Sequence, residues 1–236
     1  MNVLVITSHP DDMEELCGGT LIRCVQRGDH VTVCHVANGN MGHEVLQPEE
    51  LRSIREQEAK NSGALAGIDI LTCDIGDLLV QESSLEQRNM IVDVIRSVQP
   101  DFIITHAPND YMSDHVAVSR LVFDAAFAAS VPHYTTSDME QSIAAVTPIY
   151  YMETCMGVNF IPSEYVDISD AMELTLQMLM CHESQIKWLL DHDGIDYTET
   201  VRTCARYRGL QCGTKYAEAF SQCQTWPRIV PRRLLP

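Results

Sequence analysis

The sequence has few basic residues and no long apolar run, and each shortage argues against a class of protein. Lysine and arginine number 16 against 33 aspartates and glutamates, which gives a formal net charge of −17. Nucleic-acid partners are therefore not expected, because phosphate binding needs clustered lysine and arginine. No apolar run approaches the roughly 18 residues that span a bilayer. No basic segment precedes the apolar start, so we expect no signal peptide and a cytoplasmic protein.

Two common motifs are also missing. No Gly-x-Gly-x-x-Gly follows the first apolar run, so the fingerprint of a nucleotide cofactor site is lacking. The nine cysteines include no Cys-x-x-Cys pair, which argues against a zinc finger. Because Cys24, Cys34, Cys73 and Cys181 fall within apolar patterns, we expect buried free thiols in a reducing compartment rather than a disulfide framework.

Short apolar runs alternate with longer helical patterns along most of the chain. Strands are expected at residues 3–7, 31–36, 70–73, 101–106, 148–152 and 165–168. Helices are expected at 49–66, 85–98, 116–129, 170–190 and 198–208. This alternation predicts an α/β fold, Rossmann-like, with a mostly parallel sheet and helices on both faces. We expect residues 1–236 to form one domain, since 236 residues can bury one full core.

The most informative segment is the polar run from Ser8 to Glu14, directly after the first expected strand. Loops at the carboxyl ends of strands are where α/β proteins place ligands. His9, Asp11 and Asp12 supply one imidazole and two adjacent carboxylates, which suit a catalytic divalent metal with a general base beside it. The same spacing also fits a polar turn that caps a helix.

Two glycines, Gly18 and Gly19, fall inside the helix that we expect after this run. Glycine within a helix costs roughly 1 kcal/mol relative to alanine. The pair therefore indicates either close packing of the helix on a strand or close approach of the backbone to a ligand.

The run resembles the metal motif of the LmbE/PIG-L family of zinc-dependent de-N-acetylases. That family opens with a strand and His-Pro-Asp-Asp, often followed by Gly-Gly-Thr; the counterparts here are His9 to Asp12 and Gly18 to Thr20. The resemblance extends over nearly the whole chain. It implies a hydrolase that removes the N-acetyl group from an amino sugar or its conjugate. It also implies that His9 and Asp12 are zinc ligands and that Asp11 is the general base.

A second segment, Asn109 to His115, follows the expected strand 101–106. In a doubly wound sheet this loop can lie near the end of the first strand, and catalytic zinc normally has three protein ligands. The family has His-Pro-Asp-His here, so the resemblance implies that His115 is the third ligand and that Asp114 is a catalytic aspartate. Met112 stands where the family has a histidine thought to act as an acid. Methionine cannot donate a proton, and the candidates to replace it are His182, His43 and Tyr111.

Arg55 lies in the expected helix 49–66 and aligns with an arginine of the family. Beside Asp11, it would keep that carboxylate ionised and oriented. The alternative is a solvated, charged helix face whose ion pairs contribute little. The loop from Asn38 to His43 contains two glycines, which fit either an ordinary turn or close approach of the backbone to a ligand.

Two later segments also resemble family motifs. His182 to Gln185 is similar to His-x-Ser-Gln, and we include His182 among the catalytic candidates. Tyr216 to Phe220 is similar to Tyr-Ala-Glu-x-Phe. Glu218 would either orient the rim of the active site or serve the structure, and we favour the structural role.

The resemblance implies a Zn²⁺ cofactor and a small-molecule N-acetylated substrate. Histidine with carboxylates can also hold another divalent metal such as Fe²⁺. Single-domain relatives form trimers or hexamers, so we expect a homo-oligomer. Two alternatives remain: a non-catalytic or weakly active metal- or sugar-binding homologue, as Met112 suggests, and a hydrolase for an amide other than an amino sugar.

Overall fold

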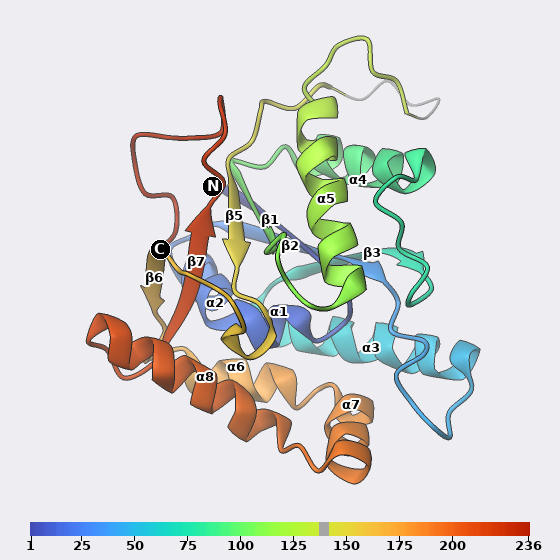
Figure 1. The fold of residues 1–236 in the computed structure, drawn as a ribbon, viewed down its shortest axis with the longest axis vertical. Coiled ribbons are helices and arrows are strands. Elements are labelled where there is room, and N and C mark those ends of the chain that lie inside the picture. Colours follow the sequence, from blue (N-terminus) through green and yellow to red (C-terminus); the bar gives the residue numbers. More distant parts are fainter. Residues whose placement is uncertain (137–141) are drawn as a thin grey trace.

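The computed structural model describes residues 1–136 and 142–236, and its centre is a seven-stranded sheet (Figure 1). The strands are β1 (Asn2–Thr7), β2 (His30–Ala37), β3 (Asp69–Ile75), β4 (Phe102–His106), β5 (Ile149–Met152), β6 (Glu164–Asp167) and β7 (Ala217–Gln222). They lie in the order β3-β2-β1-β4-β5-β7-β6. Neighbours from β3 to β5 pair in parallel, whereas β7 is antiparallel to both β5 and β6. The predicted α/β fold with a mostly parallel sheet is confirmed.

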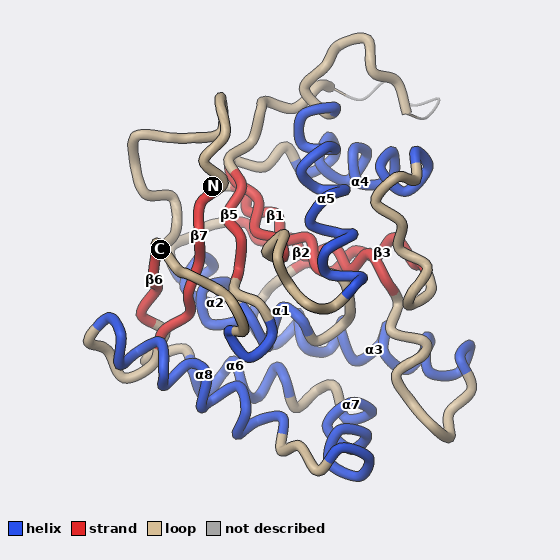
Figure 2. The backbone as a smooth tube through the Cα atoms, in the orientation of Figure 1, coloured by secondary structure: helices blue, strands red, loops and turns tan. Residues whose placement is uncertain are grey.

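Helices cover both faces of the sheet, as predicted (Figures 1 and 2). They are α1 (Asp12–Leu16), α2 (Gly18–Gln26), α3 (Pro48–Ala66), α4 (Leu85–Val98), α5 (Ser113–Ala128), α6 (Met172–Leu179), α7 (Glu183–Trp188) and α8 (Tyr197–Cys212), with short helical turns at Cys155–Gly157 and Leu189–Asp193. Helices α4 and α5 lie on one face, and α1, α2, α6 and α8 lie on the other.

Strand β1 shows why the sheet is covered on both sides. Its side chains alternate between the faces: Leu4 and Ile6 belong to the core under α4 and α5, and Val3 and Val5 belong to the core under α2 and α6. All four are fully buried. An unbroken apolar run is therefore what a central parallel strand requires.

The chain order places a ligand-binding position beside β1. From β1 the chain proceeds outward to β2 and β3, then returns to β4 on the other side of β1. The carboxyl ends of β1 and β4 are therefore neighbours, with Ile6 paired to Thr105. Open parallel sheets bind ligands at such a reversal of strand order. The polar segments after Thr7 and after His106 both begin there.

One expectation about secondary structure was wrong, and one strand was missed. The helix expected at 170–190 is broken into α6 and α7, because the chain turns at His182 so that its Nε2 lies 3.1 Å from the Glu14 carboxylate. Strand β7 was not predicted. It carries the buried polar side chain of Glu218, which interrupts the apolar pattern of a strand.

The two glycines after the polar run serve packing. The chain breaks at Cys17, so Gly18 and Gly19 begin a second helix, α2, rather than lying inside the first. A Cβ on Gly19 would lie 2.7 Å from side-chain atoms of Ile168. Of the two explanations for the glycines, close packing of the helix is therefore the one that applies to Gly19.

All nine cysteines are free, and no helix in the described part of the chain is both long enough and apolar enough to cross a bilayer. Cys24, Cys34 and Cys73 are buried as expected, whereas Cys181 is only partly buried.

Candidate active site

Three predicted residues come together beyond the carboxyl ends of β1 and β4. His9 follows β1, Asp12 begins α1 and His115 lies in the first turn of α5. Nε2 of His115 lies 3.3 Å from Oδ1 of Asp12, and Nδ1 of His9 lies 3.7 Å from Oδ2 of Asp12. One ligand atom from each of the three lies within 4.8 Å of the others. The fold thus joins two segments that are about a hundred residues apart in the chain.

The donor set fits a divalent metal. Nε2 of His115 is buried and, within the described chain, has no hydrogen-bond partner. Its Nδ1 lies 3.0 Å from Oδ2 of Asp110, an arrangement that holds the proton on Nδ1 and leaves the Nε2 lone pair facing Asp12. Two ligands of a tetrahedral zinc ion, with bonds of about 2.05 Å, lie about 3.4 Å apart. The observed 3.3 Å between Nε2 of His115 and Oδ1 of Asp12 matches that spacing.

A second histidine group shares His115 but is less suited to a metal. His106, Asp110 and His115 also bring ligand atoms close together. However, Nε2 of His106 accepts a hydrogen bond of 2.8 Å from the Ser8 backbone N–H. Burial lowers the pKa of His106 to about 4, so it stays neutral and stacks on His115 with ring centroids 3.8 Å apart.

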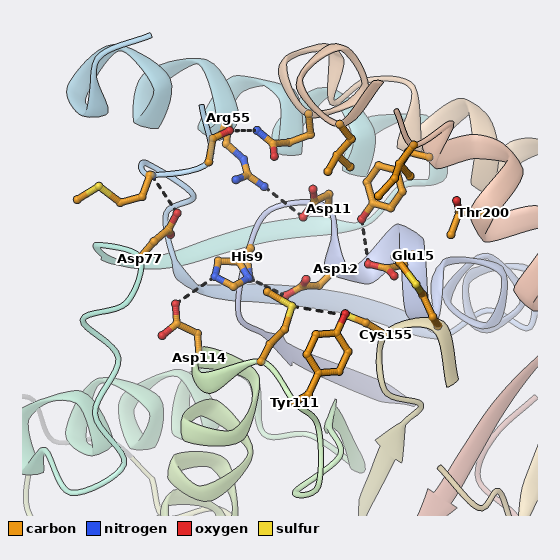
Figure 3. A pocket seen from close by; sticks show the side chains of 18 of the residues that line it. His9, Asp11, Asp12, Glu15, Arg55, Asp77, Tyr111, Asp114, Cys155 and Thr200 are labelled. Carbon is orange, nitrogen blue, oxygen red and sulfur yellow. Dashed lines mark hydrogen bonds and ion pairs between the residues drawn. The ribbon is translucent and has the colours of Figure 1, made fainter. Parts of the chain in front are cut away.

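Asp11 is held against Arg55 at the edge of the metal-ligand group (Figure 3). Its backbone has φ 109°, in the left-handed region that non-glycine residues rarely adopt, and such strain clusters at functional sites. Oδ1 of Asp11 lies 3.1 Å from Nη2 of Arg55. Burial raises the pKa of Asp11 to about 6, and the Arg55 charge opposes this shift without cancelling it. A carboxylate that titrates near neutral pH suits a general base.

The glycine loop after β2 makes room for Arg55. Nη1 of Arg55 donates 3.1 Å to the Gly39 carbonyl, and Nη2 donates to the Pro10 carbonyl. Gly39 has φ 74°, and a Cβ there would lie 2.4 to 2.5 Å from the guanidinium. Arg55 is buried, which excludes the alternative in which it lies on a solvated, charged face of its helix. The close approach that these glycines permit is to Arg55, and Gly42 of the same loop lines the cavity described next.

A cavity of about 500 Å³ opens over these residues (Figure 3). Its lining includes His9, Asp11 and Asp12 from the first segment, and Tyr111, Met112 and Asp114 from the second. Asp114 accepts from Nε2 of His9 at 3.2 Å and from the Leu78 backbone N–H at 2.8 Å. Both predicted segments therefore face one space large enough for a small ligand.

The three candidates to replace the missing histidine lie in different places. Tyr111 lines the cavity beside Met112 and is 62% exposed. His43 lines a neighbouring cavity, where it stacks on Trp188 with ring centroids 5.4 Å apart. His182 is fully buried behind α1, with its Nε2 bonded to Glu14. Of these three, Tyr111 is the one that reaches the site.

Several residues at the site were not anticipated. Asp110 orients His115, and it lies in the segment that the sequence had already singled out. Glu15 lines the cavity one helical turn after Asp11, a spacing that could have drawn attention to it. Its Oε2 accepts 2.9 Å from the Tyr197 hydroxyl. Burial, together with the Asp12 and Asp11 carboxylates, raises the pKa of Glu15 to about 7. Nothing in the sequence pointed to Tyr197.

Known proteins with this fold include deacetylases and a hydratase. The chain is 31% identical over 227 residues to diacetylchitobiose deacetylase of Thermococcus kodakarensis, covering 92% of this chain and 81% of that relative. The solved N,N'-diacetylchitobiose deacetylase of Pyrococcus horikoshii superimposes with a TM-score of 0.81 at 27% identity, covering 94% of this chain and 83% of that one. The 4-carboxy-2-hydroxymuconate hydratase of Pseudomonas putida KT2440 gives a TM-score of 0.83 at 21% identity, over 99% and 100% of the two chains, and shows the shared fold alone.

A family model agrees with the first two of these relatives. The model described as PIG-L, GlcNAc-PI de-N-acetylase, matches residues 4–126. This range contains both polar segments, from His9 to His115, and the Arg55 helix between them. The chain therefore belongs to the PIG-L, or LmbE, family of de-N-acetylases.

Proposed function

We propose that this protein is a metal-dependent hydrolase that removes the N-acetyl group from an amino sugar or its conjugate. The products are acetate and a free amine. The observation that carries the proposal is the joining of His9, Asp12 and His115 beside the Asp11–Arg55 pair, at the wall of one cavity. Relatives named as diacetylchitobiose deacetylases support the amino-sugar class.

His9, Asp12 and His115 would hold the metal, for which we propose Zn²⁺. When bound, the ion polarises the acetamide carbonyl and lowers the pKa of water. Asp11 accepts a proton from the water that attacks the carbonyl carbon. It then returns this proton to the nitrogen as the C–N bond breaks, so that one carboxyl group serves both transfers.

Three further residues position this machinery. Arg55 fixes the direction of the Asp11 carboxylate through their contact of 3.1 Å. Asp114 holds the ring of His9, which lies 3.2 Å from it. His182 acts from behind α1, where it contacts Glu14 two residues after Asp12. We assign His182 a positioning role for this reason.

The test combines acetate release with metal analysis. Purified protein with added Zn²⁺ should release acetate from N,N'-diacetylchitobiose. Asp11→Asn should keep the metal and lose about 10²-fold or more in kcat, the range of a missing general base. His115→Ala should lose the metal itself. Full activity of Asp11→Asn would contradict the assignment of the base.

A second substrate set separates the alternatives. Acetate release from N-acetylated amino acids, and not from sugars, would support the deacetylation reaction but contradict the amino-sugar substrate class. No release from either by the metal-loaded protein would support the non-catalytic alternative.

Assembly and location stay predictions. We propose a homo-oligomer, a trimer or hexamer, that acts in the cytoplasm. Light scattering on the purified protein measures the first, and fractionation of the source cells measures the second. A monomer at micromolar concentration would contradict the expected assembly.

A further inference from the structure

We propose that the cavity selects uncharged acylated sugars over anionic conjugates, and that Glu15 is a residue that sets this preference. The inference rests on the proposed function, and it narrows the substrate class of the same site. It follows from the charges that line the cavity, from the contacts of its arginine and from the free acceptor on Glu15.

Acidic side chains outnumber basic ones in the lining of the cavity. Five carboxylates line the cavity, those of Asp11, Asp12, Glu15, Asp77 and Asp114. Among the described residues that line it, there is one arginine and no lysine. A divalent cation and this arginine together bring three positive charges. At pH 8, where Glu15 is ionised, the carboxylates outnumber these positive charges, so the cavity stays net negative with the metal in place.

The arginine is buried and presents no exposed pair of N–H groups to an anion. Its guanidinium is buried and contacts Asp11, the Gly39 carbonyl and the Pro10 carbonyl. Proteins recognise carboxylates and phosphates with arginines whose paired N–H groups point at the ligand. Here Nη1 and Nη2 already contact groups of the protein, and Nε, which has no partner among the described residues, is buried. A second carboxylate in the cavity would therefore find no exposed pair of N–H groups on Arg55.

Glu15 offers an acceptor instead. Its Oε2 accepts from the Tyr197 hydroxyl at 2.9 Å, whereas its Oε1 has no hydrogen-bond partner within residues 1–136 and 142–236. A carboxylate accepts hydrogen bonds and donates none when it is ionised. A sugar hydroxyl is a suitable donor to it. An anion placed in the same cavity is repelled, more strongly than in bulk water because the walls have a low dielectric constant.

The charge of the whole chain acts in the same direction. With a net charge of −17, the protein lowers the local concentration of anionic ligands around it, and salt weakens this effect. The cavity and the protein surface therefore both disfavour anionic ligands relative to uncharged ones.

The experiment compares two glycosides that differ in charge and little in shape. These are the 4-carbamoylphenyl and 4-carboxyphenyl glycosides of N-acetylglucosamine, assayed at pH 8 and low salt with the Zn²⁺-loaded protein. At this pH Glu15, whose pKa is about 7, is ionised. We expect kcat/KM for the uncharged glycoside to be at least tenfold higher, and the ratio to fall at high salt. Glu15→Gln, which keeps an acceptor for Tyr197, should reduce the ratio at least threefold.

The matched control is Glu82→Gln, which removes the same charge from an exposed position outside the cavity and should leave the ratio unchanged. Equal or faster hydrolysis of the carboxylate would overturn the inference while leaving the proposed function intact. An unchanged ratio in Glu15→Gln would overturn the role of Glu15. If neither glycoside nor N,N'-diacetylchitobiose is hydrolysed, the proposed function has failed, and calorimetric binding of the two glycosides still decides the charge preference.

Discussion

At the scale of single residues, the site depends on a glycine that makes no contact with ligand or metal. The Arg55 guanidinium packs directly on Gly39 and occupies the space that a Cβ at this position would fill. Arg55 in turn orients Asp11. The orientation of the Asp11 carboxylate therefore depends on the lack of a side chain at Gly39, in the loop after β2.

Gly39→Ala should displace Arg55 and lower kcat at least tenfold, with metal content unchanged. Gly28→Ala is the matched control, because Gly28 also has a positive φ, 88°, and nothing lies within 4 Å of its added Cβ. Both variants carry backbone strain of about 1 to 2 kcal/mol, and only the first meets a side chain. Steady-state kinetics, with metal content measured on the same samples, separates them. Equal kcat in the two variants would show that the position of Arg55 does not depend on Gly39.

At the scale of elements, a strand late in the chain holds the start of an early helix. Both carboxylate oxygens of Glu218, on β7, accept 2.7 Å hydrogen bonds from the backbone N–H groups of Gly19 and Thr20 at the start of α2. The first N–H groups of a helix have no partner within it, and a carboxylate there also complements the helix dipole. This contact confirms the structural role expected for Glu218.

Glu218→Ala should lower the free energy of unfolding by about 2 to 4 kcal/mol, because two buried N–H groups lose a charged acceptor. Urea denaturation followed by circular dichroism measures the change. Glu173→Ala is the control, since that carboxylate is 71% exposed and pairs with Arg202 at the surface. Exposed pairs of this kind contribute about 1 kcal/mol or less. A loss in Glu218→Ala no larger than in the control would contradict the capping role.

At the scale of the whole molecule, a metal would link two segments that are far apart in the sequence and adjacent in the fold. His9 and Asp12 belong to the first loop, and His115 belongs to the helix after β4. A ligand that binds the folded state alone stabilises it in proportion to the logarithm of its concentration.

Adding Zn²⁺ at 100 times its dissociation constant should therefore stabilise the protein by about 2.7 kcal/mol. For a chain of this length, that corresponds to a rise in Tm of about 5 to 10 °C. Differential scanning calorimetry measures the shift, chelator should reverse it, and His115→Ala should abolish it. An equal rise in His115→Ala would mean that the stabilising ion binds elsewhere.

Much of the fold could be predicted from local pattern. The unbroken apolar run of β1 and the helical spacing of apolar residues in α4 are both local patterns, and burial in the two cores imposes them directly. Strand β7 and the break between α6 and α7 escaped prediction. Each depends on a buried polar contact with a distant residue, Glu218 with Gly19 and His182 with Glu14, which no local window contains.

The same division holds for the site. The sequence alone determined which reactive side chains the site contains. These are His9, Asp11 and Asp12 in one segment, and Asp114 and His115 in another that also carries Met112. Tertiary structure alone decided that Arg55 contacts Asp11, that Asp110 orients His115 and that Glu15 and Tyr197 line the cavity. The physical reason is that local spacing fixes which groups share a loop or a helix turn, whereas charge pairing and cavity shape arise between elements that meet only when the sheet is assembled.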